Sequence, residues 1–457
     1  MTALSACLHH RNRGCSSLLA MLVLLSLSLM SGRANAIPSF ARQTGVACSG
    51  CHVGGFGPQL TSFGRQFKLH GYTLSDGVGS KVPLSVMDVE SFTHTSKDQP
   101  GDAGPYAGSN NNGSIQQVSL FLAGRLSDRI GSFTQVTYSG IDRKTVMDNM
   151  DVRYATPVKW GQHIGVFGIT LNNNPSVQDA WNTSPAWRFP FMASGLVLSP
   201  GTGTLLEGGL GQQVLGTSAY VSLDGKYYGE LGFYRSLSPA VLRRLNVDVG
   251  GRLSGLTPYY RFDYTLNGKG QTLSLGVTGL DARLSPDRMP GPTDRYRDIG
   301  VDASYQYLAA IKYIVTVDAD FIHESQRRDA TFAAGGAEHR DGHVDSFNLN
   351  ASWFYKQHYG LTAGYFRNTG DRDNVLYGPN PGNGSRVGKP DSAGGIIQAD
   401  WTPFGQADSW YSPWANLRLG IQYTAYSKFN GASSNYDGFG RNASDNNTLY
   451  LFLWNAF

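Results

Sequence analysis

The residues best suited to chemistry lie together in the stretch Cys48-Ser49-Gly50-Cys51-His52. Two thiols with this spacing can form thioether bonds to both vinyl groups of one haem, and a histidine directly after them can bind the iron. The pattern predicts one covalent haem c. Cys48 and Cys51 would be its attachment points, and His52 would be the proximal ligand of the iron.

Three other chemistries use paired cysteines. A redox dithiol would need a strand before it and a helix after it, and nothing around residues 43–47 resembles that strand. A structural zinc ion needs four ligands, and residues 37–457 contain no second cysteine pair beyond the motif. A disulfide between the two cysteines would leave His52 without a role. The residues therefore favour haem attachment.

The first 36 residues predict a secretory signal peptide. Arg11 and Arg13 precede an apolar run over residues 18–30, and Ala34-Asn35-Ala36 is a small-residue cleavage site. The apolar run is too short to cross a bilayer as a helix, which argues against a membrane anchor. Of the four cysteines, two leave with the signal, so only the pair in the motif reaches an oxidising compartment.

Composition and charge narrow the class of protein. The signal segment holds three arginines and no acidic residue, so its removal lowers the net charge from +4 to +1. No basic patch marks the sequence, which excludes nucleic acid as a partner. Charged residues make up 16%, and the chain has 57 Gly, 24 Tyr, 22 Phe and 8 Trp. This composition fits a large β protein with many turns rather than a coiled coil or a disordered chain.

A short helix is predicted over residues 58–72, directly after the motif. Leu60, Phe63, Phe67 and His70 recur every three or four residues and form a stripe that would face the haem. Pro58 suits the first turn and Gly71 suits the end of such a helix.

Several side chains near the motif are candidates for contact with haem. Arg42, Arg65 and Lys68 would pair with its propionates, although a solvated basic face is the alternative for each of them. Met87 and His70 are equal candidates for the distal iron ligand, with His94 behind them, and an open five-coordinate iron is a further alternative. A methionine would raise the reduction potential relative to a histidine.

Residues 84–457 alternate between apolar and polar with a period of two, which is typical of β-strands with one face of each kind. In residues 299–307, for example, Ile299 and Val301 alternate with Gly300 and Asp302. The dipeptides Asp224-Gly225 and Asn267-Gly268 favour tight hairpins between such strands.

The spacing predicts roughly sixteen antiparallel strands with short turns on one side and long polar loops on the other. The last strand ends on the aromatic Phe457, as is usual in outer-membrane barrels. A secreted β-sandwich or propeller is the alternative, but no blade-length repeat is present, and a closed barrel leaves no exposed edge. The predicted fold is therefore all-β, an outer-membrane β-barrel seated in the lipid bilayer of a Gram-negative cell.

Three segments follow from this organisation: a signal peptide over residues 1–36, a haem segment over residues 37–82 and a barrel over residues 83–457. The haem segment has only about 46 residues, near the lower limit for a domain that folds alone. A barrel of sixteen strands leaves a polar lumen. We expect the haem segment to act as a plug inside the barrel or against its mouth.

The haem segment resembles the fused outer-membrane monohaem cytochrome c–porins, best known from iron-oxidising bacteria. The resemblance lies in four stretches: Pro38-x-Phe40-Ala41-Arg42-Gln43-Thr44-Gly45, Cys48-x-x-Cys51-His52, Pro58-x-Leu60-x-x-Phe63-Gly64-Arg65-x-Phe67-Lys68-x-x-Gly71-Tyr72, and Phe92-Thr93-His94-Thr95. Over the barrel the likeness is one of architecture only. The resemblance implies one haem c in a porin-like barrel that carries electrons across the outer membrane, with Fe(II) oxidation in some members.

The expected function is electron transfer between an extracellular donor, such as Fe(II), and a periplasmic cytochrome. The chain would then be an electron carrier rather than an ordinary enzyme, with Fe(II) oxidation as the activity it adds. The alternative is a diffusion porin that haem stabilises or gates, and a haem peroxidase is a third class that would need an open iron position. His339 and His343 lie in one loop that would meet metal at the cell surface or be simply solvated.

Overall fold

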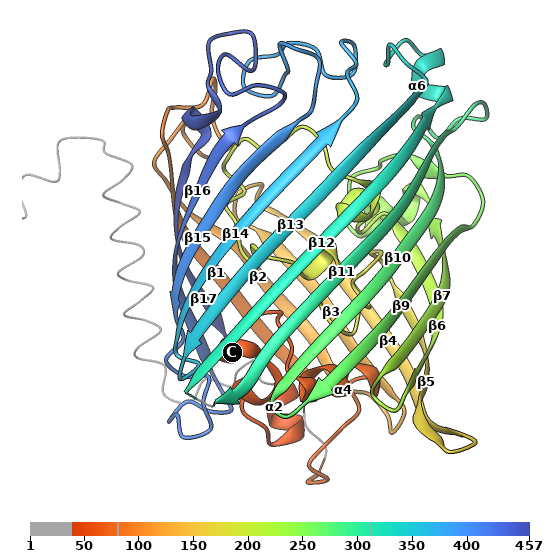
Figure 1. Cartoon of the computed structure of the whole chain (residues 1–457), viewed down its shortest axis with the longest axis vertical. Helices are drawn as coiled ribbons and strands as arrows, with labels where there is room; N and C mark the ends of the chain where they lie inside the picture. The colour runs from red at the N-terminus through yellow and green to blue at the C-terminus, as the bar shows by residue number, and fades with distance from the viewer. Residues whose placement is uncertain (1–38, 80–81, 311) are drawn as a thin grey trace, which may run out of the picture.

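The computed structural model describes residues 39–79, 82–310 and 312–457. The predicted signal peptide, residues 1–36, lies outside this part of the chain. The described residues form a closed antiparallel β-barrel with short helices inside one end (Figure 1). Among them, no helix is long and apolar enough to cross a membrane.

Sixteen long strands and one short extra strand make up the sheet. The strands are β1 (Leu84–Thr95), β2 (Asn112–Arg125), β3 (Ile130–Ser139), β4 (Lys144–Trp160), β5 (His163–Asn172), β6 (Val214–Leu223), β7 (Tyr227–Ser236), β8 (Arg252–Leu253), β9 (Thr257–Gly268), β10 (Gln271–Ser285), β11 (Asp294–Ala310), β12 (Tyr313–Arg328), β13 (Asp341–Tyr355), β14 (Tyr359–Gly370), β15 (Ser392–Trp401), β16 (Asn416–Lys428) and β17 (Thr448–Ala456). The helices are α2 (Ser39–Thr44), α3 (Cys48–Cys51), α4 (Ser62–Leu69), α5 (Pro239–Arg244) and α6 (Asp329–Ala333), with single helical turns at Val53–Gly55, Pro185–Trp187, Leu205–Gly209 and Ala443–Asn446.

The barrel closes where the first strand pairs with the last. In this antiparallel ladder Val89 of β1 lies opposite Trp454 of β17. Phe457 extends the pairing, since its N–H and C=O both bond to the backbone of Val86. The predicted fold class, a barrel of about sixteen antiparallel strands, is confirmed.

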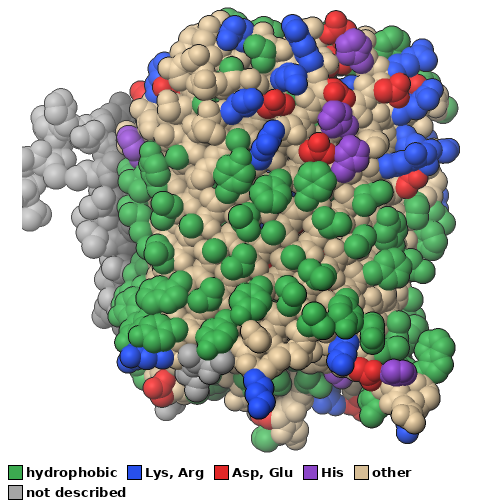
Figure 2. Space-filling view, in the orientation of Figure 1, with side chains coloured by type: hydrophobic (Ala, Val, Ile, Leu, Met, Phe, Trp, Pro, Cys, Tyr) green, Lys and Arg blue, Asp and Glu red, His purple; other side chains and the backbone are tan. Residues whose placement is uncertain are grey.

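The side-chain alternation also agrees with the prediction. On β11, Ile299 and Val301 are exposed on the outer surface, whereas Asp298, Ser304 and Gln306 are buried on the inner one. Figure 2 shows the resulting belt of hydrophobic side chains, with charged side chains above and below it. A closed barrel satisfies all its strand hydrogen bonds within the bilayer, and the apolar belt matches lipid. The protein is therefore an outer-membrane barrel.

The two ends of the barrel differ in their connections. The predicted tight turn at Asp224-Gly225 is confirmed, since both residues adopt positive φ in the three-residue connection between Leu223 and Tyr227. The second predicted turn is tight but lies two residues later, because Asn267 and Gly268 still pair with β10 and Lys269 and Gly270 form the turn. Short turns lie at the end that holds α2, α4 and the C-terminus, and long loops lie at the other end (Figure 1). Short turns face the periplasm in such barrels and long loops face the outside, which orients the molecule.

One long loop does not stay outside. Residues 173–213 join β5 to β6, and we name them the inward loop because they fold into the lumen. Ser176, Gln178 and Ala180 of this loop are fully buried. The indole N–H of Trp181 donates to Thr265 on the inner face of β9, at 3.1 Å. The strand spacing predicted only one more long polar loop here, but inside the barrel the polar groups of the lumen wall supply the hydrogen-bond partners that water would otherwise provide.

The helices α2 to α4 fill the periplasmic end of the lumen. Arg65 of α4 donates to Gln306 of β11, at 2.6 Å. On the opposite wall the hydroxyl of Tyr220 donates to the Leu69 carbonyl at 2.6 Å. The Tyr72 hydroxyl donates to Asp151 of β4, also at 2.6 Å. The small segment therefore obtains its core and its hydrogen-bond partners from the barrel around it.

A candidate haem pocket in the lumen

The C-x-x-C-H motif occupies one helical turn and the residue after it. The helix α3 spans the two cysteines, and the His52 N–H closes it by donating to the Cys48 carbonyl at 2.8 Å. Thr61 caps the following helix, because its hydroxyl accepts from the Gly64 N–H at 3.2 Å. The same hydroxyl donates to the Gly50 carbonyl at 2.5 Å. One threonine thus starts α4 and ties it to α3.

Gly64 allows the two helices to touch. A Cβ on this residue would lie 2.3 Å from the Cys51 carbonyl oxygen, so only glycine fits. The predicted helix is confirmed, although it begins at Ser62 rather than near Pro58. The predicted stripe is wrong at Phe63, which is 39% exposed. Because α4 rests on α3 through Gly64, its Gly64 face turns to the lumen and Phe63 turns away.

Both thiols and the imidazole of the motif open into a cavity of about 520 Å³ inside the barrel. This volume lies within the roughly 300–1,000 Å³ of sites that enclose small ligands and cofactors. Three parts of the chain form the walls: the N-terminal helices, the strands around the barrel closure and the inward loop. The main lining residues are Phe40, Cys48, Cys51, His52, Phe56, Phe67, Met87, Phe121, Phe133, Trp187, Phe191, Met192 and Trp454.

The barrel wall behind this cavity is apolar, as is a second patch of the inner wall that Leu206 and Leu210 of the inward loop cover. Met87 and Phe121 point inward from β1 and β2, and Phe452 and Trp454 point inward from β17. The ring of Phe56 packs edge-on against Trp454 at a centroid distance of 4.8 Å. Barrels of this size normally have a polar interior. An apolar patch on the inner wall therefore calls for an apolar occupant.

The polar atoms around the cavity fit an iron porphyrin. His52 Nδ1 and the Trp454 indole nitrogen are buried and have no hydrogen-bond partner. Burial, followed by the charge of Arg418, lowers the pKa of His52 to about 4. The imidazole is therefore neutral near pH 7, the form that binds iron. Burial raises the pKa of Cys48 to about 11 and that of Cys51 to about 12, so both thiols are protonated.

The structure separates the candidates for the distal ligand. Met87 lines the cavity together with His52, whereas His70 does not line it, and its ring nitrogen lies 2.8 Å from the Gln66 carbonyl. His94 lies near the far end of β1 and pairs with a loop side chain. Met192 also lines the cavity. Sequence reasoning missed Met192, because it comes from the inward loop.

Only one of the three residues predicted to pair with the haem propionates lines the cavity. Arg42 donates to the Leu84 carbonyl at 2.7 Å, and Arg65 is committed to the barrel wall, so neither lines the cavity. Lys68 does line it, and its ammonium group donates to Asn182 at 2.7 Å. Arg188 of the inward loop lines it as well and pairs with Asp320 at 3.1 Å.

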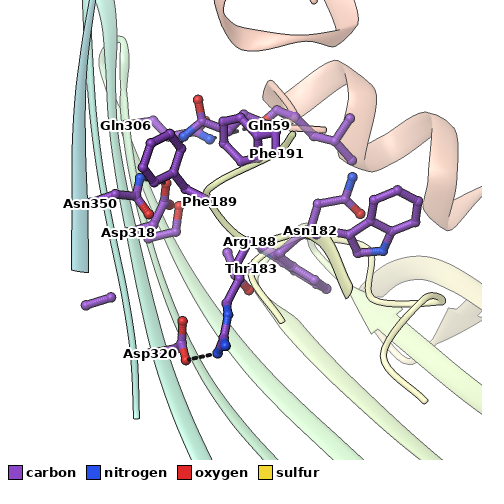
Figure 3. Close-up of a pocket in the computed structure, with 15 residues that line it drawn as sticks. Gln59, Asn182, Thr183, Arg188, Phe189, Phe191, Gln306, Asp318, Asp320 and Asn350 are labelled. Atoms are coloured by element: carbon purple, nitrogen blue, oxygen red, sulfur yellow. Dashed lines mark hydrogen bonds and ion pairs between the residues drawn. The ribbon is translucent and has the colours of Figure 1, made fainter. Parts of the chain in front are cut away.

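A smaller cavity of about 20 Å³, room for about one water molecule, adjoins the larger one. Figure 3 shows Arg188 reaching toward Asp320, while Gln59 and Asn182 lie nearer the helices. Asn182 and Arg188 line both cavities. The cavity that holds the motif therefore has an apolar wall at the barrel closure and a polar, charged rim on the opposite side.

The loop that carries His339 and His343, at the extracellular end of the barrel, shows no metal-binding geometry. His343 pairs with Asp371 at 2.7 Å, and its second nitrogen lies 3.9 Å from Asp345. Over the described ranges, no group of three or more His, Cys, Asp or Glu side chains could hold a metal ion. The iron predicted at His52 does not need such a cluster, because the porphyrin of haem supplies four nitrogen ligands.

Comparisons with known proteins found similarity to solved structures. No family description matches the chain, and no curated protein matches it. Among solved structures, Salmonella typhi OmpF in complex with daunomycin is 12% identical over 83% of this chain and 98% of its own, with a TM-score of 0.47. The outer-membrane channel DcaP of Acinetobacter baumannii is 11% identical over 84% and 99%, with a TM-score of 0.46. An anion-selective porin from Comamonas acidovorans is 12% identical over 82% and 98%, with a TM-score of 0.45. These values concern the fold alone, and the strand pairing described above is what establishes the barrel.

Proposed function

We propose that this chain is a monohaem c-type cytochrome built into a porin-like outer-membrane barrel. It would carry electrons between an extracellular donor, such as Fe(II), and a periplasmic cytochrome. The observation that carries the proposal is the C-x-x-C-H motif, which opens into a cavity inside the lumen with an apolar wall on the side of the barrel closure. When bound, haem c would supply the one-electron redox chemistry, and the protein would supply position and environment.

The residues around the cavity have distinct tasks in this proposal. Cys48 and Cys51 would hold the group covalently, and the neutral imidazole of His52 would bind its iron. A sulfur ligand from Met87 or Met192 would favour the reduced state relative to a second imidazole. Phe121 and Trp454, with their neighbours on the apolar wall, exclude water from the cavity and lower the local dielectric constant.

Electron exchange tests this function. The purified protein, in lipid nanodiscs, would be mixed in its oxidised form with Fe(II) and in its reduced form with a periplasmic cytochrome, while haem absorbance is followed by stopped flow. We expect transfer in both reactions. The variant Cys48→Ser/Cys51→Ser should show none, because it cannot attach the group. Absence of exchange with every donor and acceptor tried would contradict the proposal.

A diffusion pore is the second candidate function. The observation that favours it is the barrel itself, since sixteen strands are enough to surround an aqueous channel. The helices α2 to α4 and the inward loop argue for a narrowed lumen. Conductance in planar bilayers separates the two candidates. We expect a conductance far below that of an open sixteen-stranded barrel, and a large, steady conductance would support the pore.

A further inference from the structure

Positive charge surrounds the periplasmic mouth of the barrel. We define a basic ring as the exposed Lys and Arg side chains at the short turns and the strand ends beside them. Its members are Arg125, Arg129, Lys159, Lys226, Lys269, Lys312 and Lys356. They belong to six turns in succession around the barrel, from the β2–β3 turn to the β13–β14 turn. In Figure 2, Lys and Arg side chains also lie below the hydrophobic belt on the face shown.

Few acidic side chains offset this ring. Asp128 bonds to Arg125, and Asp224 lies 2.5 Å from His163. The remaining turn, residues 402–415, contributes Asp408, and the segment after α4 contributes the exposed Asp76. The other end of the barrel is different, because its long loops mix both signs, as in Asp371, Arg372 and Asp373. The positive charge is therefore a feature of the periplasmic end rather than of the whole surface.

The ring encircles the segment that carries the haem motif. The Gln406 side chain donates to the Lys356 carbonyl at 3.4 Å, and the neighbouring Gly405 carbonyl accepts from the Ser49 N–H of α3 at 3.0 Å. On another side, the β6–β7 turn approaches Gln66 of α4 at Gly225. A molecule that docks on the ring would consequently meet the mouth into which α2 to α4 are packed.

We propose that the basic ring is a docking surface for an acidic protein, and that the periplasmic electron acceptor therefore presents a negative face. The inference rests on the proposed function for the role of that partner. Complementary charge raises the rate of encounter and orients weakly bound electron-transfer partners, without need of a large apolar interface. Long lysine side chains on short turns suit this purpose, because they follow the contours of different partners.

Binding of one redox protein in two charge states tests the proposal. The probes are mitochondrial cytochrome c, which is basic, and its succinylated derivative, which is acidic. The chain would be held in nanodiscs of zwitterionic lipid, and its affinity for each probe would be measured by fluorescence anisotropy. We expect binding of the acidic probe alone, and weakening of that binding as salt is raised from low to about 0.5 M, because exposed charges are then screened.

Charge reversal locates the surface. Lys226→Glu/Lys269→Glu/Lys356→Glu should weaken binding of the acidic probe by roughly tenfold or more at low salt. Arg243→Glu/Arg244→Glu/Arg340→Glu is the matched control, since it reverses three exposed cations at the opposite end, and its affinity should equal that of the wild type. Equal loss in both triple variants, or binding of the basic probe by the wild type, would overturn the proposal.

Two further binding measurements separate this proposal from failure of haem attachment and from binding of lipid headgroups to the ring. The Cys48→Ser/Cys51→Ser variant should bind the acidic probe as well as the wild type, so failure of haem attachment leaves the docking result intact. Nanodiscs that contain anionic phosphatidylglycerol should bind the probe as well as zwitterionic ones. Loss of binding in anionic nanodiscs would mean that lipid headgroups cover the ring, and this would also overturn the proposal.

Discussion

The contact between α3 and α4 at Gly64 predicts that a glycine-to-alanine change, which usually stabilises a helix, lowers stability here. In a helix interior, replacing glycine by alanine normally stabilises the helix by about 0.5–1 kcal/mol. Gly64→Ala should instead destabilise this region, because the added Cβ would lie 2.3 Å from the Cys51 carbonyl oxygen and 3.1 Å from a Leu60 methyl group. Relief of that overlap requires the two helices to separate.

The size of this loss in stability follows from the contacts that break when α3 and α4 separate. Overpacking of a tight contact costs roughly 1–3 kcal/mol. Thr61 also stands to lose its bonds to the carbonyls of Gly50 and Cys51, at 2.5 and 2.9 Å, each of which contributes about 1 kcal/mol. After subtraction of the gain in helix propensity, we expect a net loss of about 2–4 kcal/mol in local stability. At about 1.4 kcal/mol per factor of ten, amide exchange in α3 and α4 should accelerate at least about 30-fold.

Hydrogen exchange followed by mass spectrometry measures this directly, on peptides that cover the motif and α4. The control is Gly101→Ala, because no atom lies within 4 Å of a Cβ at that position. The control should leave exchange in α3 and α4 unchanged. Exchange in Gly64→Ala that is equal to or slower than that of the wild type would refute the close packing of the two helices.

Three further predictions concern the pocket and its supports. Met87→Leu or Met192→Leu should remove the absorption band of methionine-bound ferric haem and lower the reduction potential, because both residues line the cavity. His70→Ala should change neither the band nor the potential. A change in the His70 variant alone would show that His70, and not a methionine, is the distal ligand. Arg153→Met leaves Asp151 buried without its charged partner and should cost about 3–5 kcal/mol in stability, measured by guanidinium unfolding. A loss below about 1 kcal/mol would show that the ion pair is not needed. Phe452→Gln puts a polar group into the apolar wall and should reduce the haem content per barrel, measured as the ratio of haem to protein absorbance; an unchanged ratio would count against an apolar occupant.

The strands were predictable because their signal is local. A period of two with one apolar face is determined by the lipid outside and the polar lumen inside, and both act on every strand alike. Residues 299–307 and the turn at Asp224-Gly225 show this well, since their burial and backbone angles agree with what their sequence predicts. The number of strands and their closure follow from repetition of the same pattern.

The pocket was predictable only in part. The thiols and His52 belong to one short motif, but Met192, Trp187 and Arg188 reach the cavity from a loop more than 130 residues further along the chain. The loop did carry a signal, because large apolar side chains such as Trp181, Trp187 and Phe189 are unusual in a solvated loop, but no local pattern shows which part of the lumen they would meet. Its buried ion pairs exist only once the barrel has closed.

One signal in the sequence did indicate the apolar wall. On β17 the outward Leu449 and Leu451 alternate with inward Tyr450 and Phe452, so that both faces of this strand are apolar. A strand of a polar-lumen barrel needs only one apolar face. The second such face indicates an apolar occupant inside, close to the point of closure.

The most direct measurement is the mass of the peptide that contains Cys48 and Cys51, from protein matured in a host with cytochrome c biogenesis and isolated from the outer-membrane fraction. The account predicts a peptide heavier by the mass of one haem, together with the absorption spectrum of a haem c bound through two thioethers. A peptide of unmodified mass, or a colourless protein, would contradict it.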